Sequence, residues 1–529
     1  MHAFLNVDEI IRLIASELVT SGERGAAVAL AYCRKSFEDP VLDALWEVQD
    51  HLYPLLKSFP GEIWDEKSGG IFVSTPRDVL FLPLNLGKSL KRIPTEAQWT
   101  RFRKYARRIR ALNVNPSQGS LPPNILSVLQ HHTLNAPLLP GLNTFVCREA
   151  TAAFIPFIPL FLSSRTTIID IGFAEFLLNP PTLMIASVIA TLSTVCPDLR
   201  EVRLHPLPRA TIIATATSEM LLTCNRNTLR NFAVDAIPTE AARKVLYQLP
   251  NLSGLRSLLL GSTSPFEVLL PNLTALGIAY HQGHRWLRVF HGATLSKLTK
   301  VAFDTEWEPI GDFLEAFENF AVATSASATL SEFAFYTTRS WSPNYHSLLS
   351  FKQLKRLTIE SSCDNGCSSR VDDEIIIILA RAMPKMEDLR LGSEPCQTPN
   401  GVTVKGLVEL ARCCTNLTTL RVHIRADSLV QAAADGAAPS PSDGKLTTPR
   451  GECALTTLEV GSTPIPEESA LTVALALLHI FLRISRIKYT NAQWRVIAKT
   501  IKTSKQLSNR IGALTRSSGK NAHTTSKSY

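Results

Sequence analysis

Residues 353–360 read QLKRLTIE, and Leu354, Leu357 and Ile359 within this stretch have the spacing L-x-x-L-x-L. Successive side chains of a strand point to opposite faces, so the polar residues between the apolar ones can point away from them. The stretch therefore predicts a strand that buries its apolar side chains on one face and tolerates any polar residue on the other.

The same spacing recurs in twelve further places when any apolar residue is allowed in the L slots. From Ile109, the first slot of the first copy, to Leu455, that of the last, the steps average about 29 residues, the upper end of the leucine-rich-repeat period. We therefore predict an α/β fold, a leucine-rich-repeat solenoid with parallel strands on its concave side and helices on its convex side. The twelve further copies are Ile109/Leu112/Val114, Leu142/Phe145/Cys147, Ile168/Ile171/Phe173, Leu199/Val202/Leu204, Leu229/Phe232/Val234, Leu255/Leu258/Leu260, Leu273/Leu276/Ile278, Leu298/Val301/Phe303, Leu330/Phe333/Phe335, Met386/Leu389/Leu391, Leu417/Leu420/Val422 and Leu455/Leu458/Val460.

The solenoid is predicted to cover residues 109–505. Within it, residues 431–450 are small, polar and contain proline, which predicts a flexible loop. Helices at 467–489 and 492–501 are expected to close the hydrophobic end of the array, and a basic disordered tail is expected at 506–529. The clearest helical segments of the convex side are 181–195, 239–249, 311–322, 372–382 and 404–412.

Residues 1–50 differ in kind from the repeats and predict a short all-α segment of three helices. Apolar residues between positions 4 and 19 have helical spacing. A second helix is expected at 25–32, and a third from about Val41 to Trp46 with Pro40 in its first turn. Three short helices cannot bury every apolar side chain among themselves, so we expect an exposed apolar face and a partner that covers it.

A second pattern within these residues is formed by Leu5, Glu9, Ile10, Ile14, Leu18, Ala29, Leu30, Cys33, Arg34, Phe37, Leu42, Leu45 and Trp46. With it the segment resembles an F-box, in the divergent form that precedes irregular leucine-rich repeats in large fungal families. In that family the F-box docks on a small Skp-type adaptor, and through it on a cullin, while the repeats select a target protein for ubiquitination. The resemblance implies an adaptor-binding face of Leu5, Val7, Ile10, Ile14, Leu42, Leu45 and Trp46. The alternative is a helical cap on a solenoid.

Residues 51–108 are interpreted as a connector and capping region. Its last part, 96–110, predicts a helix that buries Trp99, Phe102, Ala106 and Ile109. Its outer face is basic. Such a face is usually only solvated, and the alternative is that it binds phosphate or an acidic partner. The basic residues of that face are Arg101, Arg103, Lys104, Arg107 and Arg108.

Composition narrows the class of protein. No apolar run is long enough to cross a bilayer, and the N-terminus lacks a secretory signal pattern, so we expect no membrane contact and a cytoplasmic or nuclear location. The ten cysteines are then expected to be reduced. Cys363 and Cys367, in CDNGC, and the adjacent Cys413 and Cys414 are either loop and core residues or a metal site.

The formal net charge of +9 is concentrated at the C-terminal end. Eleven of the 55 basic residues lie between Arg483 and the C-terminus, where there is no acidic residue, so 44 basic residues remain against 46 acidic ones. A near-neutral body does not favour nucleic-acid binding, although a basic tail leaves it as a third hypothesis.

No catalytic motif is found: G-x-S-x-G, H-E-x-x-H, GxxxxGK[ST] and a GxGxxG after a strand are all absent from the sequence. We therefore expect a binding protein, not an enzyme, and no cofactor. The residues that should point outward from the predicted sheet are the candidates for target recognition, in competition with a merely solvated face. They are Glu201, Arg203, Arg356, Thr358, Glu360, Asp388, Arg390 and Arg421.

Two functions follow as hypotheses. The first is a non-catalytic target-recognition subunit of an SCF-type ubiquitin ligase, with an unknown target protein. The second is a leucine-rich-repeat interaction scaffold without attachment to a ligase.

Overall fold

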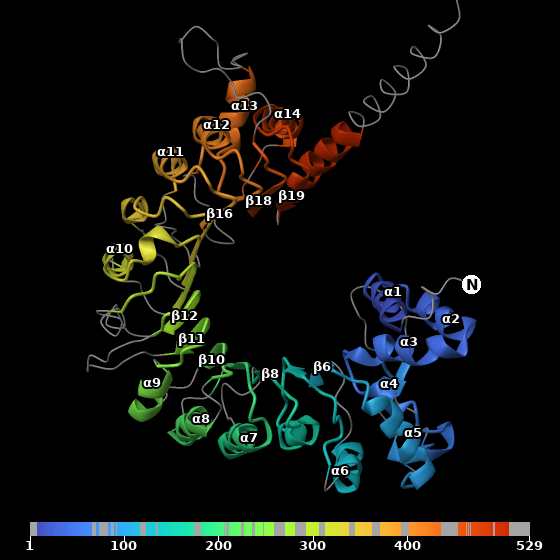
Figure 1. Cartoon of the computed structure of the whole chain (residues 1–529). Coiled ribbons are helices and arrows are strands. Elements are labelled where there is room, and N and C mark those ends of the chain that lie inside the picture. Colours follow the sequence, from blue (N-terminus) through green and yellow to red (C-terminus); the bar gives the residue numbers. More distant parts are fainter. Residues whose placement is uncertain are drawn as a thin grey trace, which may run out of the picture. The chain divides into compact units, whose positions relative to one another are not determined.

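The computed structural model divides the chain into two compact units, residues 1–258 and 259–529. Each unit is an α/β arrangement in which parallel strands follow one another in chain order and helices lie against one face of the strands (Figure 1). The structure describes residues 8–65, 70–72, 83–85, 89–90, 92–116, 123–133, 136–173, 181–205, 207, 211–223, 227–234, 239–246, 248–258, 270–280, 293–305, 313–337, 344–361, 371–392, 401–434, 453–461, 463, 465, 467–489 and 492–506.

The first unit begins with three helices that share a core of their own. They are α1 (Asp8–Thr20), α2 (Arg24–Cys33) and α3 (Lys35–Glu47). Their buried centre is formed by Ile11, Ala15, Ala27, Phe37, Val41 and Ala44, with Leu18, Val19, Leu30, Ala31 and Leu45 partly buried around it. The third helix starts six residues earlier than predicted, so Pro40 lies inside it and not in its first turn. At the start of this helix Phe37 N–H donates to Arg34 O in a tighter i, i+3 turn.

A short connector joins these helices to the sheet of the first unit. It contains α4 (Tyr53–Leu56), the short strands β2 (Trp64–Asp65), β3 (Gly70–Phe72), β4 (Pro83–Asn85) and β5 (Ser89–Leu90), and α5 (Glu96–Ala106). The α5 helix begins after Thr95, whose N–H donates to Gln98 Oε1 at 2.9 Å and so satisfies one of the donors left over at a helix start. As predicted, Trp99, Phe102, Ala106 and Ile109 are buried.

Seven parallel strands form the sheet of the first unit: β1 (Val48–Gln49), β6 (Ala111–Val114), β7 (Thr144–Cys147), β8 (Ile168–Gly172), β9 (Glu201–His205), β10 (Asn231–Val234) and β11 (Gly254–Leu258). The helices between them are α6 (Pro123–His132), α7 (Thr182–Val195), α8 (Thr211–Thr223) and α9 (Glu240–Leu246). Between β7 and β8 a 3-10 helix (Ile155–Phe161) takes the helical position.

Eight parallel strands form the sheet of the second unit: β12 (Ala275–Tyr280), β13 (Lys300–Thr305), β14 (Glu332–Thr337), β15 (Arg356–Ser361), β16 (Asp388–Gly392), β17 (Thr419–Arg421), β18 (Thr457–Gly461) and β19 (Arg486–Tyr489). Helices α10 (Phe313–Ala323), α11 (Asp373–Ala382), α12 (Val404–Cys413), α13 (Ala426–Ala434) and α14 (Ala470–Ile480) pack beside them. The stretch QLKRLTIE leads into β15, where Leu354, Leu357 and Ile359 are buried.

Strand register shows which residues occupy the repeated core position. Leu276, Val301, Phe333, Leu357, Leu389, Leu420, Leu458 and Ile487 are successive partners across the second sheet. The first seven are each the middle slot of a predicted L-x-x-L-x-L copy, so the spacing correctly predicts strand and register from β12 to β18. The large Phe303 packs between the aromatic rings of Phe313 and Phe317, with centroid distances of 5.0 and 5.5 Å.

Two copies in the first unit were predicted out of register. Phe145 pairs with Ile169 and not with Ile171, so that copy begins at Thr166. Thr166 is fully buried in a slot usually filled by an apolar residue, and its hydroxyl donates to Leu142 O at 3.2 Å, which satisfies it there. Because its first slot is the polar Thr166, this copy did not match a pattern that allows only apolar residues.

Register also corrects the copy that was placed at Leu255, Leu258 and Leu260. Phe232 pairs with Leu255, so Leu255 fills the middle slot and the buried Leu252 fills the first. A run of leucines fits the spacing in two phases, and only pairing with β10 selects one.

The sequence pattern missed the first and last strands of the array. β1 places Gln49, not an apolar residue, opposite Leu112. The helix predicted over 467–489 ends at Ile480, and β19 follows because Ile484 and Ile487 continue the repeat spacing. Residues 431–434 of the predicted loop belong to α13, while 435–450 and 507–529 lie outside the described residues.

The observed architecture is thus an open α/β arrangement of parallel strands and helices, compatible with a solenoid. Within the described part of the chain, every helix is too short or too polar to span a bilayer.

Candidate protein-binding surfaces

The three N-terminal helices expose large apolar side chains. Leu13 and Ile14 on α1 are 70% and 42% exposed, and Val28 and Tyr32 on α2 are 42% and 86% exposed. Val28 and Tyr32 are four residues apart and so lie on one face of their helix. We call these four side chains the N-terminal apolar residues. The core of the three helices has six buried residues, and these four side chains are not among them.

The predicted adaptor-binding residues overlap this set only at Ile14. Leu5 and Val7 lie outside the described residues, and Ile10 is half-buried. Leu42, Leu45 and Trp46 are also half-buried, and two of them are turned inward: Leu45 packs on the helical core, and the Trp46 ring stacks on Tyr105 with 4.7 Å between ring centroids. Leu13, Val28 and Tyr32 were missed because helical spacing identifies buried positions more readily than apolar residues left outside.

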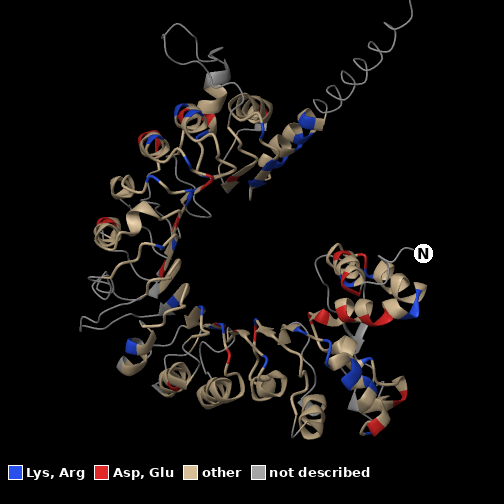
Figure 2. Cartoon of the chain, in the orientation of Figure 1, with Lys and Arg blue, Asp and Glu red and all other residues tan. Residues whose placement is uncertain are grey.

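A buried arginine joins α3 to the end of α5. We call this contact the α3–α5 junction. Arg108, predicted on a solvated outer face, is only 7% exposed, which corrects that prediction. Its guanidinium donates to the carboxylates of Asp39 and Asp43 and, at 3.1 Å, to the backbone oxygen of Asp39. Lys104 Nζ adds a weaker contact, 3.8 Å from Glu38 Oε1. Figure 2 shows acidic residues along α3 and basic ones along α5.

Electrostatics at this junction favour the charged forms of both partners. The hydrogen bond from Arg108 lowers the pKa of Asp39 below its ordinary value. Burial by itself would lower the pKa of Arg108, but the hydrogen bonds to Asp39 and Asp43 outweigh it and raise that pKa. The junction therefore holds α3 on α5 as an ion pair over the whole physiological pH range.

The face of each sheet that the helices do not cover is called here the open face. In the first unit it carries a small polar cluster on β8 and β9. Arg203 contacts Glu201 at 2.5 Å and Asp170 at 3.7 Å, and His205 Nε2 lies 3.5 Å from Asp170 Oδ1. The hydrogen bond to His205 is the largest cause of a lowered pKa at Asp170. The predicted residues Glu201 and Arg203 thus lie together, and Asp170 joins them.

In the second unit the open face carries a larger ionic network on β15 to β19. Arg421 lies 2.7 Å from Glu360 Oε1 and 3.3 Å from Glu459 Oε2, and Arg390 lies 3.0 Å from Asp388 Oδ1 and 4.0 Å from Glu459 Oε1. Lys488 Nζ completes it at 2.5 Å from Glu459 Oε1. The open-face network is Glu360, Asp388, Arg390, Arg421, Glu459 and Lys488, and charges of both signs alternate on these strands in Figure 2.

Glu459 is the centre of the network, since its side chain is only 4% exposed. Burial would raise its pKa, but the Lys488 hydrogen bond and the charges of Arg390 and Arg421 lower it overall. Three acids and three bases balance one another, so the network offers a partner a fixed arrangement of charges with little net field.

Two predicted recognition residues lie beside the network. Arg356 is half exposed and reaches Glu332 Oε1 at 3.2 Å, a carboxylate that Lys300 also contacts at 3.0 Å. Thr358 is half-buried on β15. Glu459, Lys488, Glu332 and Asp170 were not predicted; applying the strand register to β18, β19, β14 and β8 would have found them.

The described residues show no metal-binding cluster. No group of three or more His, Cys, Asp or Glu side chains among them is arranged to hold a metal ion. Cys363 and Cys367 lie outside the described residues, and burial raises the pKa of Cys414 to about 12, which keeps that thiol protonated. His132 stacks on Trp99 with 3.7 Å between ring centroids, and burial lowers its pKa.

Comparison with known proteins adds no family. No protein-family model matches this chain, and no curated protein matches it. The surfaces described above therefore carry the functional argument.

Proposed function

We propose that this chain is the non-catalytic target-recognition subunit of an SCF-type ubiquitin ligase. In this proposal the N-terminal helices are an F-box that binds a Skp-type adaptor, and the strand–helix array is a leucine-rich-repeat solenoid that binds a target protein on its open face. The observation that carries the proposal is a three-helix segment with its own core that leaves Leu13, Ile14, Val28 and Tyr32 in water. Apolar residues exposed together on small helices are typical of a protein interface.

A second candidate is an interaction scaffold in which these helices only cap the array. Three contacts favour it: the Arg108 junction, the stack of Trp46 on Tyr105, and the pairing of β1 with β6. The first two tie the helical segment to the end of the connector, and the third ties it to the first strand of the array. A cap needs such contacts, and it does not need exposed apolar side chains.

Adaptor binding separates the two candidates. Leu13→Asp and Ile14→Asp each place a charge on an exposed apolar position without touching the core, so the helices stay folded. We expect each to reduce capture of a purified Skp-type adaptor by about tenfold or more, the loss typical of an interface hot spot. The measurement is a binding isotherm with the purified full chain.

The matched control is Leu183→Asp on α7, because Leu183 is 71% exposed, as Leu13 is 70% exposed. It should bind the adaptor like the unchanged chain. Absence of adaptor binding by the unchanged chain, or binding that survives both α1 substitutions, would favour the scaffold.

A further inference from the structure

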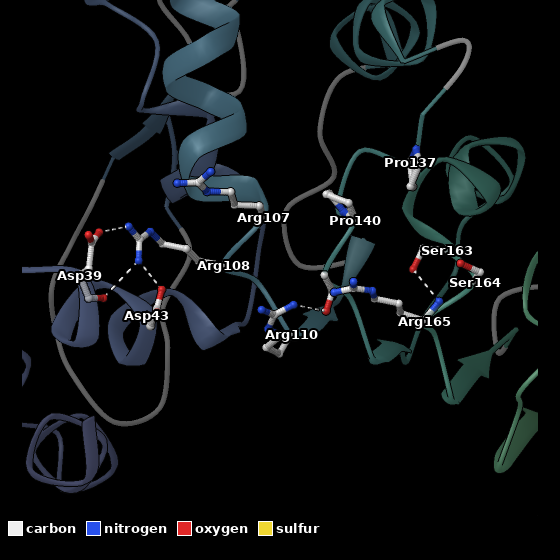
Figure 3. A pocket seen from close by; sticks show the side chains of 11 residues that line it. Asp39, Asp43, Arg107, Arg108, Arg110, Pro137, Pro140, Ser163, Ser164 and Arg165 are labelled. Carbon is white, nitrogen blue, oxygen red and sulfur yellow. Dashed lines mark hydrogen bonds and ion pairs between the residues drawn. The ribbon is translucent and has the colours of Figure 1, made fainter. Parts of the chain in front are cut away.

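A pocket of about 640 Å³ opens beside the α3–α5 junction in the first unit (Figure 3). It lies where α5 ends and where β6, β7 and β8 begin. We call it the arginine pocket; it is lined by Asp39, Asp43, Arg107, Arg108, Arg110, Pro137, Pro140, Gly141, Ser163, Ser164 and Arg165.

The charges of the pocket do not cancel. Asp39 and Asp43 are both engaged by Arg108, which leaves Arg107, Arg110 and Arg165. Over the described part of the chain, no carboxylate forms an ion pair with any of these three. Four arginines and two aspartates give the lining a formal charge of +2, and this positive potential favours an anion.

Two of these arginines face one another. Figure 3 shows the side chains of Arg110 and Arg165 extending toward each other. Arg110 Nη1 donates to Gly141 O at 3.1 Å, which uses one of the five N–H donors of its guanidinium. A side chain at position 141 would not fit, because a Cβ there would lie 2.2 Å from Arg110 Nη1 and 2.7 Å from Arg107 O.

The backbone holds both arginines in place. Asn143 N–H and Thr144 N–H both donate to Arg110 O, at 2.8 and 3.0 Å, which fixes the start of β6 against β7. The Arg165 N–H donates to the buried Ser163 Oγ at 3.3 Å, within a turn closed by Ser163 N–H on Thr166 Oγ1 at 3.1 Å. Side chains on a fixed backbone lose less freedom when a ligand binds.

We propose that the arginine pocket binds the phosphate group of a phosphorylated small molecule. A phosphate monoester has two negative charges and three terminal oxygens, so it can accept hydrogen bonds from Arg110 and Arg165 at once. A carboxylate has one charge and two oxygens in a plane, and it compensates less of the positive charge. This assignment is independent of adaptor binding, which concerns α1 and α2.

The test uses the purified full chain titrated with inorganic phosphate by calorimetry, at low and at high NaCl. We expect saturable binding that weakens as salt screens the exposed arginines. Arg110→Ala and Arg165→Ala should each weaken binding by about tenfold, the effect of losing one charge-assisted hydrogen bond. Arg165→Lys should weaken it less, because the charge stays but the paired donors are lost.

Arg101→Ala is the matched control, since Arg101 is exposed on α5 and does not line the pocket. It should bind phosphate like the unchanged chain. The unfolding midpoint of each variant shows that it is folded.

Glycerol phosphate and a phosphoserine peptide present the same oxygens, so comparing them identifies the carrier. Tighter binding of glycerol phosphate supports a small-molecule ligand, and tighter binding of the peptide overturns that part of the proposal. Equal binding of acetate and phosphate, or an equal loss in the Arg101→Ala variant, overturns the pocket as a phosphate site.

Discussion

The α3–α5 junction and the open-face network each hold one buried charge, but of opposite sign. In the first, the cation Arg108 is buried between the more exposed acids Asp39 and Asp43. In the second, the anion Glu459 is buried among Arg390, Arg421 and Lys488. The first ties two helices from separate parts of the chain together, whereas the second lies along neighbouring strands of one sheet.

In both clusters the exposed partners of the buried charge should matter more for stability than the buried charge itself. Removing the exposed members leaves a buried charge without compensation, which is costly, whereas removing the buried member leaves charges that water can solvate. The junction has two exposed partners and the network has three, so the loss of partners should be felt more at the junction.

The largest effect is expected for Asp39→Ala combined with Asp43→Ala. Arg108 would keep only its bond to the backbone oxygen of residue 39, so we expect the free energy of unfolding to fall by about 3 kcal/mol. Chemical denaturation, followed by the fluorescence of Trp46 and Trp99 near the junction, measures this loss.

This prediction is wrong if Arg108→Met lowers the free energy of unfolding as much as the double substitution does. Methionine keeps most of the apolar stem and leaves two solvated acids, so its cost should be clearly smaller. Glu62→Ala, at an exposed acid, should change stability by less than about 0.5 kcal/mol.

An intermediate effect is expected from pH at Glu459. Because its pKa is lowered in the folded chain, its stabilising contribution is present above the ordinary value of 4.5 and is lost as pH falls below that. The unfolding midpoint of the unchanged chain should therefore fall more steeply below pH 4.5 than that of Glu459→Gln, which has no group to protonate at this position. Parallel curves for the two proteins would show that Glu459 does not contribute.

The smallest effect is expected for Arg356→Ala, beside the network. Both partners of this pair are accessible to water, and Lys300 still contacts Glu332 after the change. We expect a loss of less than about 0.5 kcal/mol in the free energy of unfolding, as for most exposed ion pairs. A loss above 1 kcal/mol would mean that Arg356 and Glu332 belong to the open-face network.

Local spacing predicted much of the array. Leu354, Leu357 and Ile359 show their role in sequence because one face of a strand must be buried, and that requirement acts on residues only a few positions apart. The same rule failed at Thr166, where a buried hydroxyl is satisfied by the carbonyl of Leu142, and at Leu255, where two phases fit equally well.

The candidate surfaces were predicted less completely. The spacing correctly put Glu201, Arg203, Arg390 and Arg421 on strands whose outward faces carry charge clusters. It could not predict which charges pair, since Arg421 contacts Glu360 across 61 residues of chain. Of the residues predicted to bind an adaptor, Ile14 is exposed as an interface needs, while Trp46 packs on Tyr105.

Most of the strands, the three-helix segment and the absence of the searched catalytic motifs could be predicted from the sequence, because each depends on residues close together in the chain. Which charges are buried depends on contacts between distant parts of the chain. The sequence predicts Arg108 on the same basic outer face as the exposed Arg107, and Arg108 differs because Asp39 and Asp43, 69 and 65 residues away, lie opposite it. Burial of a charge depends on the partners that the fold brings to it, and short-range spacing does not contain that information.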